Sequence, residues 1–310
     1  MTFQQLEYII AVDKSRHFVN AATACGVTQS TLSSTIQKLE AEIDVIIFDR
    51  SKHPIEPTPM GRQVIQQAEI ILHNSSMLRQ MVKSHREEER GQLRIGMIPD
   101  VAQVVFPPFA RIVKENNPLV EPHIHALPPA ALINMLQRSE LDMVIVSAGD
   151  ILDTNLLSFD LWTERFVLYV SPASVLYNRE NLRPEDLQNG EIWVLRDFHD
   201  SYPQLTEVIH RETMHTSFLD CGNLPTLISA VDVNGGYTLI PETCAQFLSA
   251  EQKSNIRRVN SGKFFRTTVL AIRKDFMREG MLNIVTNAMK RIIPREMLSS
   301  RLLNFDKVKI

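Results

Sequence analysis

The feature that most constrains this fold is a long segment, between Gly61 and Gly91, that contains neither glycine nor proline. Thr58 followed by Pro59 is a strong helix start, because threonine caps free amides and proline fits the first turn. We therefore predict a single helix over residues 59–90, roughly 45 Å long at about 1.5 Å per residue. Such a helix cannot lie inside one small domain, so it divides the chain into a part before it and a part after it.

Along this helix, small and apolar side chains recur in alternating steps of four and three residues: Val64, Ala68, Ile71, Ser75, Leu78 and Val82. Such spacing is typical of the seam of a coiled coil. Because a small N-terminal domain cannot cover a helix of this length, we expect the seam to contact a second copy of the chain. The alternative is a helix that lies along its own chain, which the polar segment SHREEERGQ before the next domain makes less favoured. Ala68 and Ser75 make the seam thin, so we also expect contacts elsewhere in the assembly.

Residues 1–58 are predicted to form a small helical domain that ends in a hairpin. Gly26 ends one short helix, and Thr28 caps the next helix. The buried face of that next helix is marked by Leu32, Ile36, Leu39 and Ile43. Helix, glycine turn and helix together have the shape of a helix-turn-helix, whose second helix can enter the major groove of DNA.

The opposite face of that second helix is polar, short-chained and uncharged, so its hydroxyls and amides can read base edges. No acidic residue occurs from Lys14 to Leu39, which makes this region locally basic although the net charge is -3. Residues 46–58 then read as a two-stranded wing with basic residues near its tip, suited to phosphate contacts. The predicted DNA-binding residues are Arg16, Thr28, Gln29, Ser30, Thr31, Ser33, Ser34, Gln37, Arg50, Lys52 and His53. The alternative is that this helix face is simply solvated.

Residues 91–294 are predicted to form two α/β lobes, because apolar strands alternate with helical segments. The chain is expected to cross between the lobes at residues 166–172 and 266–274. The predicted boundaries are 91–165 and 266–294 for lobe I, 166–265 for lobe II, and 295–310 for a C-terminal tail. Sheets of this kind bind ligands beyond the carboxyl ends of their strands, so we predict a ligand cleft between the lobes.

Composition narrows the class of protein. Hydrophobic residues make up 44% and charged residues 22%, which is ordinary for a soluble globular chain. No apolar run is long enough to cross a membrane, and the N-terminus lacks the basic start of a signal peptide. Three scattered cysteines, Cys25, Cys221 and Cys244, fit reduced thiols in the cytoplasm. Phosphate-loop, hydrolase-nucleophile and zinc-protease motifs are missing, so we expect neither an enzyme nor a cofactor.

The run VTQSTLSSTIQKLEAEIDVIIFDR, residues 27–50, resembles the helix-turn-helix of the LysR-type transcriptional regulators. That family typically reads V-S/T-Q-P-x-L-S, followed by I-x-x-L-E and later L-F-x-R. The T-x-x-G at Thr58–Gly61 fits the same pattern, as does the order of elements along nearly the whole chain. One departure is Ser30, where the family usually has proline, which loosens the first turn of the helix without changing its register.

This resemblance implies an α/β fold class with three parts. They are an N-terminal winged helix-turn-helix (1–58), a linker and dimerisation helix (59–90) and a C-terminal two-lobed domain like those of periplasmic binding proteins (91–294). It also implies binding of double-stranded DNA, an unidentified small-molecule effector, and homodimers or homotetramers formed through the linker helices and effector domains. We expect no membrane contact, no metal and no catalytic residue.

Within the family, RHFVNAATACGVTQ, RIGMIPDV and LRDFHD resemble the OxyR-like subgroup of peroxide sensors. In that subgroup sensing depends on a cysteine directly after the histidine that corresponds to His199, with a second cysteine further on. Here those two positions hold Asp200 and Ile209, and a carboxylate cannot form a disulfide. We therefore expect no thiol-based peroxide sensing. Oxidant sensing by another route stays open, and so does an engineered origin of Asp200, although the missing second cysteine favours natural divergence.

The resemblance also implies a set of effector-binding residues: Asp100, Val101, Pro129, Ser147, His199, Asp200 and Asn223. Family members commonly have serine or threonine in place of Asp100, where the hydroxyl and helix amides hold an anionic effector. Because Asp100 would repel an anion, we expect a cationic or neutral ligand, or none. A metal site at Asp197, His199 and Asp200 is a less favoured alternative, beside the plainer possibility that Asp200 caps a helix and Arg196 pairs with Asp197.

Overall fold

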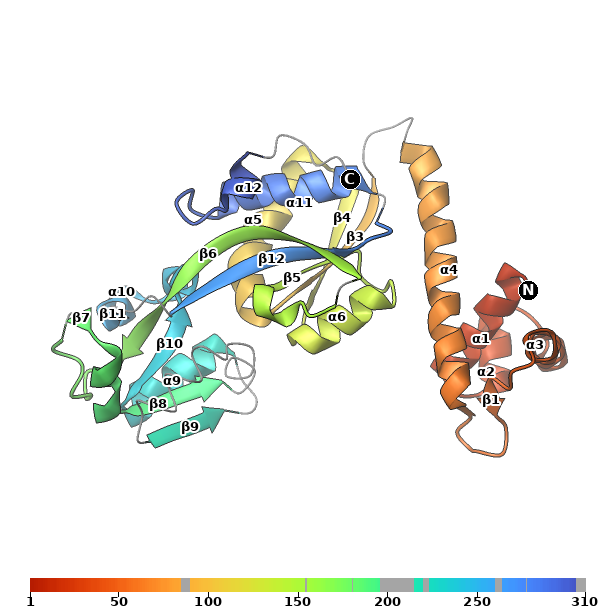
Figure 1. The fold of residues 1–310 in the computed structure, drawn as a ribbon, viewed down its shortest axis with the longest axis horizontal. Helices are drawn as coiled ribbons and strands as arrows, with labels where there is room; N and C mark the ends of the chain where they lie inside the picture. The colour runs from red at the N-terminus through yellow and green to blue at the C-terminus, as the bar shows by residue number, and fades with distance from the viewer. Residues whose placement is uncertain are drawn as a thin grey trace. The chain divides into compact units, whose positions relative to one another are not determined.

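The structure is a computed structural model that describes residues 1–84, 90–153, 155–179, 181–195, 215–219, 223–259, 264–276 and 278–304. The chain divides into two compact units, Met1–Glu87 and Glu88–Ile310. Each unit has its own hydrophobic core. Figure 1 shows the helices and strands of both units. No helix among the described residues is both long and apolar enough to cross a membrane.

The first unit is a winged helix-turn-helix followed by a long helix. Its elements are α1 (Phe3–Ser15), α2 (Phe18–Ala24), α3 (Gln29–Ile43), β1 (Phe48–Asp49), β2 (Glu56–Pro57) and α4 (Pro59–Ser84). The strands β1 and β2 pair antiparallel, with Phe48 opposite Pro57 and Asp49 opposite Glu56. This order confirms the predicted fold class for the N-terminal part.

The turn between α2 and α3 forms as the sequence predicts. Gly26 has a φ of 68°, a left-handed conformation that glycine adopts without strain. Its amide donates to the carbonyl of Thr23 at 3.2 Å, and the amide of Val27 donates to the carbonyl of Ala22 at 3.0 Å. The Thr28 hydroxyl then accepts from the amide of Thr31 at 3.2 Å, which fixes where α3 begins.

The start of α4 is tied closely to the wing. The Thr58 hydroxyl donates to the carbonyl of Ile46 at 2.7 Å and accepts from the Gly61 amide at 2.9 Å. A Cβ on Gly61 would lie 2.0 Å from the carbonyl oxygen of Ile47, so only glycine permits this approach. The described helix ends at Ser84, and residues 85–89 of the predicted range lie outside the described residues.

The predicted seam of α4 needs a correction in its first half. Ala68 is 1% exposed and Val64 is partly buried, and both pack against the core of their own unit. This part of the seam therefore does not face a second chain, because α1 packs alongside α4 there. Ile71 and Leu78, further along, are 37% and 53% exposed, so only the later part is open to a partner.

The second unit contains a long sheet flanked by helices. Its first half comprises β3 (Gly91–Met97), α5 (Pro99–Asn116), β4 (Val120–Ala126), α6 (Pro129–Gln137), β5 (Met143–Ser147), η1 (Ala148–Asp150) and β6 (Leu156–Val170). Its middle comprises β7 (Asn181–Leu182), η2 (Pro184–Asn189), β8 (Glu191–Leu195), β9 (His215–Leu219), α9 (Leu224–Asn234), β10 (Tyr237–Pro241) and η3 (Glu242–Phe247). Then follow α10 (Ala250–Lys253), β11 (Ile256–Val259), β12 (Phe265–Arg273), α11 (Glu279–Ile292) and α12 (Ser300–Leu303).

Two long antiparallel strands, β6 and β12, connect the lobes, and they lie side by side in Figure 1. The strand order is β4-β3-β5-β12-β6-β10-β8-β9, with β3 parallel to both β4 and β5 in lobe I. The first part of β6 pairs with β12, and its last five residues, Phe166–Val170, pair with β10 of lobe II. The predicted crossing at 166–172 is thus the end of one continuous strand that starts in lobe I.

Helix α5 begins at Pro99 and continues through Pro107 and Pro108. Burial of Val101, Val104 and Val105 along one face stabilises this part of the helix. The predicted tail, residues 295–310, is not separate from lobe I along residues 295–304.

The segment after α11 packs back onto lobe I. The amide of Ser299 donates to the carbonyl of Leu161 at 2.9 Å, and Leu298 forms a β-bridge with Trp162. Leu298 and Leu302 are 8% and 3% exposed. Burial of these apolar side chains stabilises the packing of the segment on lobe I. The segment has few apolar residues, so the sequence did not indicate this packing.

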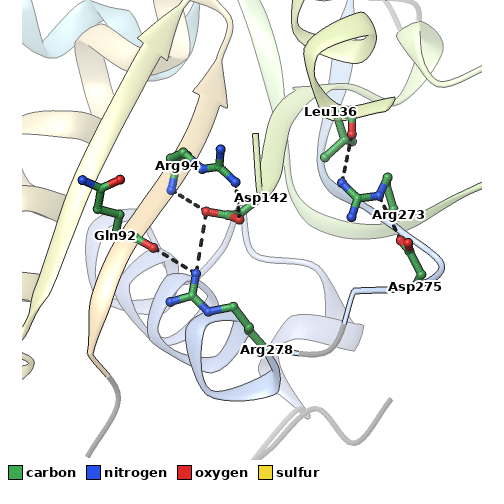
Figure 2. Close-up of polar contacts among 7 residues, drawn as sticks. All are labelled: Gln92, Arg94, Leu136, Asp142, Arg273, Asp275 and Arg278. Atoms are coloured by element: carbon green, nitrogen blue, oxygen red, sulfur yellow. Dashed lines mark hydrogen bonds and ion pairs between the residues drawn. The ribbon is translucent and has the colours of Figure 1, made fainter. Parts of the chain in front are cut away.

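A buried carboxylate holds the strand ends of lobe I together (Figure 2). Asp142, 3% exposed, accepts from the Arg94 amide at 2.8 Å and from its guanidinium at 3.2 Å. Arg278, at the start of α11, lies 3.8 Å from the same carboxylate and donates to the Gln92 carbonyl at 2.9 Å. Asp142 thereby fixes the amino end of β5 to β3 and to α11.

Candidate functional site

The predicted base-reading residues lie on the exposed side of α3. Leu32, Ile36 and Leu39 are fully buried on the other side. The exposed residues of the predicted set are Thr28, Gln29, Ser30, Thr31, Ser34 and Gln37, while Ser33 is half-buried. This face offers hydroxyl and amide groups without charge, which is the chemistry that reads base edges in a major groove.

Several hydroxyls at the start of α3 bond to one another. The Thr28 hydroxyl lies 3.0 Å from that of Ser30 and 2.8 Å from that of Thr31, and Ser34 donates to the Thr31 carbonyl at 3.1 Å. These bonds fix the side chains in place on the helix. The exposed amides of Gln29 and Gln37 are the longest groups on this face, so they reach furthest toward a groove.

Each basic side chain that was assigned to the DNA backbone, apart from His53, is paired with a carboxylate. The nitrogen–oxygen distances are 3.0 Å for Arg16–Asp13, 2.9 Å for Arg50–Glu40 and 2.6 Å for Lys52–Glu56. His53 is exposed in the wing turn. The sequence did not show that these cations are paired.

Arg50 has an intramolecular role in addition to any contact with DNA. Its partner Glu40 also accepts from the amides of Ile47 at 2.8 Å and Phe48 at 3.2 Å. The guanidinium of Arg50 lies 5.3 Å from the centre of the Phe18 ring. Glu40 and Arg50 therefore fix the first strand of the wing against α3 and α2.

Three predicted effector residues follow neighbouring parallel strands. Asp100 follows β3, Pro129 follows β4, and Ser147 ends β5, so the sheet brings all three to the carboxyl edge of lobe I. Asp100, Val101 and Ser147 are buried, and Pro129 is half-buried. The Ser147 amide donates to the Asp150 carboxylate at 3.1 Å.

The lobe II members of the predicted set are His199, Asp200 and Asn223. Asn223 is exposed and caps α9, accepting from the Thr226 amide at 3.1 Å. Arg196, Asp197, His199 and Asp200 lie outside the described residues, as does Cys221. Among the residues that are described, no group of three or more His, Cys, Asp or Glu side chains could hold a metal ion.

Asp100 belongs to a buried ionic network. Arg266, at the start of β12, donates to the Asp100 carboxylate and, through Nε, to Oε1 of Glu164 at 2.8 Å. The side chains of Arg266 and Glu164 are 0% exposed and that of Asp100 is 5% exposed. The second oxygen of Glu164 accepts from the Thr243 amide at 2.9 Å and hydroxyl at 2.6 Å.

This network links elements of both lobes. Asp100 comes from α5, Glu164 from β6, Arg266 from β12, and Thr243 from η3 after the lobe II strand β10. The Trp162 indole adds a hydrogen bond to Glu164 at 3.0 Å. Two carboxylates share one guanidinium, so the network carries an excess of one negative charge when all three groups are ionised.

The network also affects the protonation state of the groups in and around it. Burial alone would raise the pKa of Glu164, but the Arg266 guanidinium and hydrogen bonds from Thr243 and Trp162 lower that pKa overall, so Glu164 stays ionised. Next to Thr243, burial and the nearby Asp100 carboxylate raise the pKa of the Cys244 thiol. Burial and Glu7 also raise the pKa of Cys25. Both described thiols are therefore protonated and weakly nucleophilic at neutral pH.

Arg266 and Glu164 are functional candidates that the sequence did not single out. Arg266 lies at the start of an apolar strand. A charged residue at such a position was the one signal in the sequence for a functional or structural role. Nothing in the sequence shows that residues 100, 164 and 266 meet. Only the pairing of β6 with β12, which sets Glu164 opposite Arg266, brings the latter two together.

Comparison with known protein families gives two matches that together span most of the chain. The model "LysR substrate binding domain" matches residues 86–283, more than half of the chain. The model "Bacterial regulatory helix-turn-helix protein, lysR family" matches residues 3–62. These two ranges correspond to the effector unit and to the winged helix-turn-helix described above.

Similar proteins include both peroxide regulators and another type of regulator. The "DNA-binding transcriptional dual regulator OxyR" of Escherichia coli is 29% identical over 245 residues, 78% of this chain and 79% of that protein. The "HTH-type transcriptional regulator EstR" of Acinetobacter baylyi is 26% identical over 296 residues, 94% of this chain and 97% of that protein.

Solved structures show the same fold. A cysteine-to-aspartate variant of full-length OxyR from Pseudomonas aeruginosa has a TM-score of 0.79 at 23% identity, with 97% of this chain and 98% of that chain covered. An arginine-to-histidine mutant of full-length BenM has a TM-score of 0.55 at 19% identity, with 94% and 96% covered. Its two family matches make this chain a member of the LysR family of bacterial DNA-binding transcriptional regulators, with an effector-binding domain and no enzymatic activity.

Proposed function

We propose that α3 and the wing of this regulator bind operator DNA, with Gln29 and Gln37 directed at base edges and Lys52 and Arg16 at phosphates. The uncharged polar face of α3 is the observation that carries this assignment. Base-edge contacts specify sequence, whereas phosphate contacts position the protein. Because its partner is DNA, we propose that the protein acts in the cytoplasm.

A gel shift on the DNA upstream of the protein's own gene tests this assignment. We expect a salt-sensitive complex that competes poorly with unrelated DNA, and we expect Gln29→Ala to reduce that preference. A matched control is Asn20→Ala, an exposed amide on α2 outside the proposed reading face. If Gln29→Ala binds with unchanged affinity and preference, the reading face is misassigned.

For the assembly, we propose a homodimer through the later part of α4, extended to a tetramer by pairing of effector domains. The exposed apolar side chains of Ile71 and Leu78 support this proposal, since side chains on one helix seam are normally covered. A dimer would place two α3 helices on successive major grooves. Leu78→Glu should lower the mass measured by light scattering, whereas Met60→Glu, on the exposed start of α4, should not.

For sensing, we propose that the protein does not detect peroxide through thiols. The support is chemical: Asp200 and Ile209 stand where the OxyR-like subgroup has cysteines, and the raised pKa values of Cys25 and Cys244 make those thiols poor nucleophiles. Oxidant sensing by another route is the second candidate, favoured by similarity to relatives described as peroxide-inducible gene activators. A metal-dependent sensor using Asp197, His199 and Asp200 is the least favoured.

Genome-wide binding maps with and without peroxide separate these candidates. Our proposal predicts maps that do not change on peroxide treatment. A peroxide-dependent change that persists when all three cysteines are replaced would support the second candidate. A change that disappears with the cysteines would refute the proposal.

For the effector, we propose that the site near Asp100 does not take a simple carboxylate. Arg266, the cation in this region, already bonds to Asp100 and Glu164, and the excess negative charge repels an anion. A cationic or neutral ligand, or none, fits better. Isothermal titration with small organic acids should show no binding. Tight binding to the unchanged protein that is lost in Asp100→Ser would contradict the proposal.

A further inference from the structure

The ion pairs that hold the predicted phosphate-binding cations differ in how easily they can open. Glu40 and Arg50 are 12% and 35% exposed, and Glu40 also holds two backbone amides, so this pair is part of the fold. Lys52 and Glu56 are 56% and 46% exposed. Exposed pairs contribute little to stability, so a competing anion can replace one partner.

We propose that Glu56 is a built-in competitor for DNA phosphate: it holds the Lys52 ammonium group, and the wing contacts DNA only when this pair opens. The inference rests on the proposed contact between Lys52 and the DNA backbone. It adds that the affinity of that contact is set by an acidic residue of the same hairpin. Removing the carboxylate should therefore strengthen binding to any DNA sequence.

The geometry of the hairpin supports a competition for Lys52. Nζ of Lys52 lies 2.6 Å from Oε2 of Glu56, which is a hydrogen-bond distance. The N–H group that donates to Glu56 is therefore not available to a phosphate oxygen until the pair opens. Glu56 lies on β2 directly opposite Asp49 on β1, so the hairpin has two carboxylates beside its basic tip. Asp49 bonds to the amide and hydroxyl of Ser51 instead, which leaves Glu56 as the partner of Lys52.

Glu56 also lies within the field of further cations. The hydrogen bond from Lys52 is the main cause that lowers the pKa of Glu56, and the charges of Arg62 and Arg16 lower it further. Arg62, in the first turns of α4, was not among the predicted DNA-binding residues, yet it shares this field. These cations keep Glu56 ionised, so its carboxylate remains available to hold the Lys52 ammonium group.

The test uses the full-length protein and a mixed-sequence DNA duplex, because phosphate contacts do not depend on sequence. Fluorescence anisotropy over a series of salt concentrations would be measured for Glu56→Gln, Lys52→Gln and the double variant. Glu42→Gln is the matched control, since it removes the same charge at the far end of α3, where Glu42 pairs with the N-terminal amine.

We expect Glu56→Gln to bind about two- to fivefold tighter per wing, the range that an exposed ion pair provides. Glu42→Gln should change affinity less. Lys52→Gln should weaken binding and lower the slope of log K against log salt by about 0.9 per wing. In the Lys52→Gln background, Glu56→Gln should increase the affinity for DNA no more than Glu42→Gln does.

Three results would overturn the inference in different ways. If Lys52→Gln weakens binding but Glu56→Gln gains nothing over Glu42→Gln, the phosphate contact stands and the competition is refuted. If Lys52→Gln leaves both affinity and salt slope unchanged, the proposed phosphate contact itself fails and the competition fails with it. A full gain from Glu56→Gln in the Lys52→Gln background would show general repulsion and also refute the competition.

Discussion

Replacing Arg266 with methionine tests the buried network directly. The substitution leaves the carboxylates of Asp100 and Glu164, which are 5% and 0% exposed, without their shared cation. Removing one partner of a buried ion pair generally costs about 3–5 kcal/mol. If the variant instead protonates one of these carboxylates, the free-energy cost is similar. Keeping one glutamate with an ordinary pKa near 4.3 neutral at about pH 7 costs about 3.7 kcal/mol.

The loss in Arg266→Met has a defined dependence on pH. In the unchanged protein the pKa of Glu164 is lowered, so its stabilising contribution is present above the unfolded-state pKa and is lost as the pH falls through the folded-state value. In the variant, burial without the guanidinium raises the folded-state pKa instead. The variant is therefore destabilised above the unfolded-state pKa, and its deficit should shrink as the pH falls toward about 4.3.

Urea unfolding at about pH 7 and about pH 5 measures both expectations. The chain has two tryptophans, Trp162 and Trp193, and both lie in the second unit, so their fluorescence reports on the unit that holds the network. The combined replacement Asp100→Asn, Glu164→Gln and Arg266→Met removes all three charges and should recover part of the loss. A deficit below about 1 kcal/mol for Arg266→Met alone, or an equal deficit at both pH values, would refute the buried charged network.

Three further predictions concern single positions. Gly61→Ala should destabilise the first unit by about 1–3 kcal/mol in thermal melts, because the new Cβ would meet the Ile47 carbonyl, whereas exposed Met60→Ala should change it little. Asp142→Ala should cost the second unit about 3 kcal/mol or more, since Arg278 is only 9% exposed, while Glu242→Ala, whose partner Arg258 is 72% exposed, should cost less than about 1 kcal/mol in the same urea assay. Burial raises the pKa of Cys244, so iodoacetamide should label that thiol only after unfolding, and fast labelling of the native protein would contradict its burial.

Local signals were sufficient to predict the N-terminal unit. Gly26, Thr28 and Pro59 each set a helix boundary through backbone chemistry that depends on near neighbours, and the structure has all three boundaries where the sequence put them. The seam of α4 was harder, because a heptad pattern shows which face is apolar but not what covers it. Ala68 fits the seam and yet packs against its own domain.

Contacts between distant residues could not be predicted in the same way. Asp100 was singled out as a departure from the family pattern, but its partner Arg266 lies more than half the chain away in sequence. The pairing of Lys52 with Glu56 is local, yet the same short segment also contains Asp49, which bonds to Ser51 instead. Choosing between two nearby carboxylates requires the register of the hairpin, which depends on the folded strands.

The buried network also limits how a signal can pass through the effector domain. Asp100 on α5, Arg266 on β12 and Thr243 on η3 are tied through Glu164, so separating α5 from η3 would expose or unpair these groups. That step costs about 3–5 kcal/mol, whereas a ligand typically couples two states by about 1–3 kcal/mol. A ligand therefore cannot readily drive the lobes apart at this point. We expect any effector of this chain to act while the network stays closed instead.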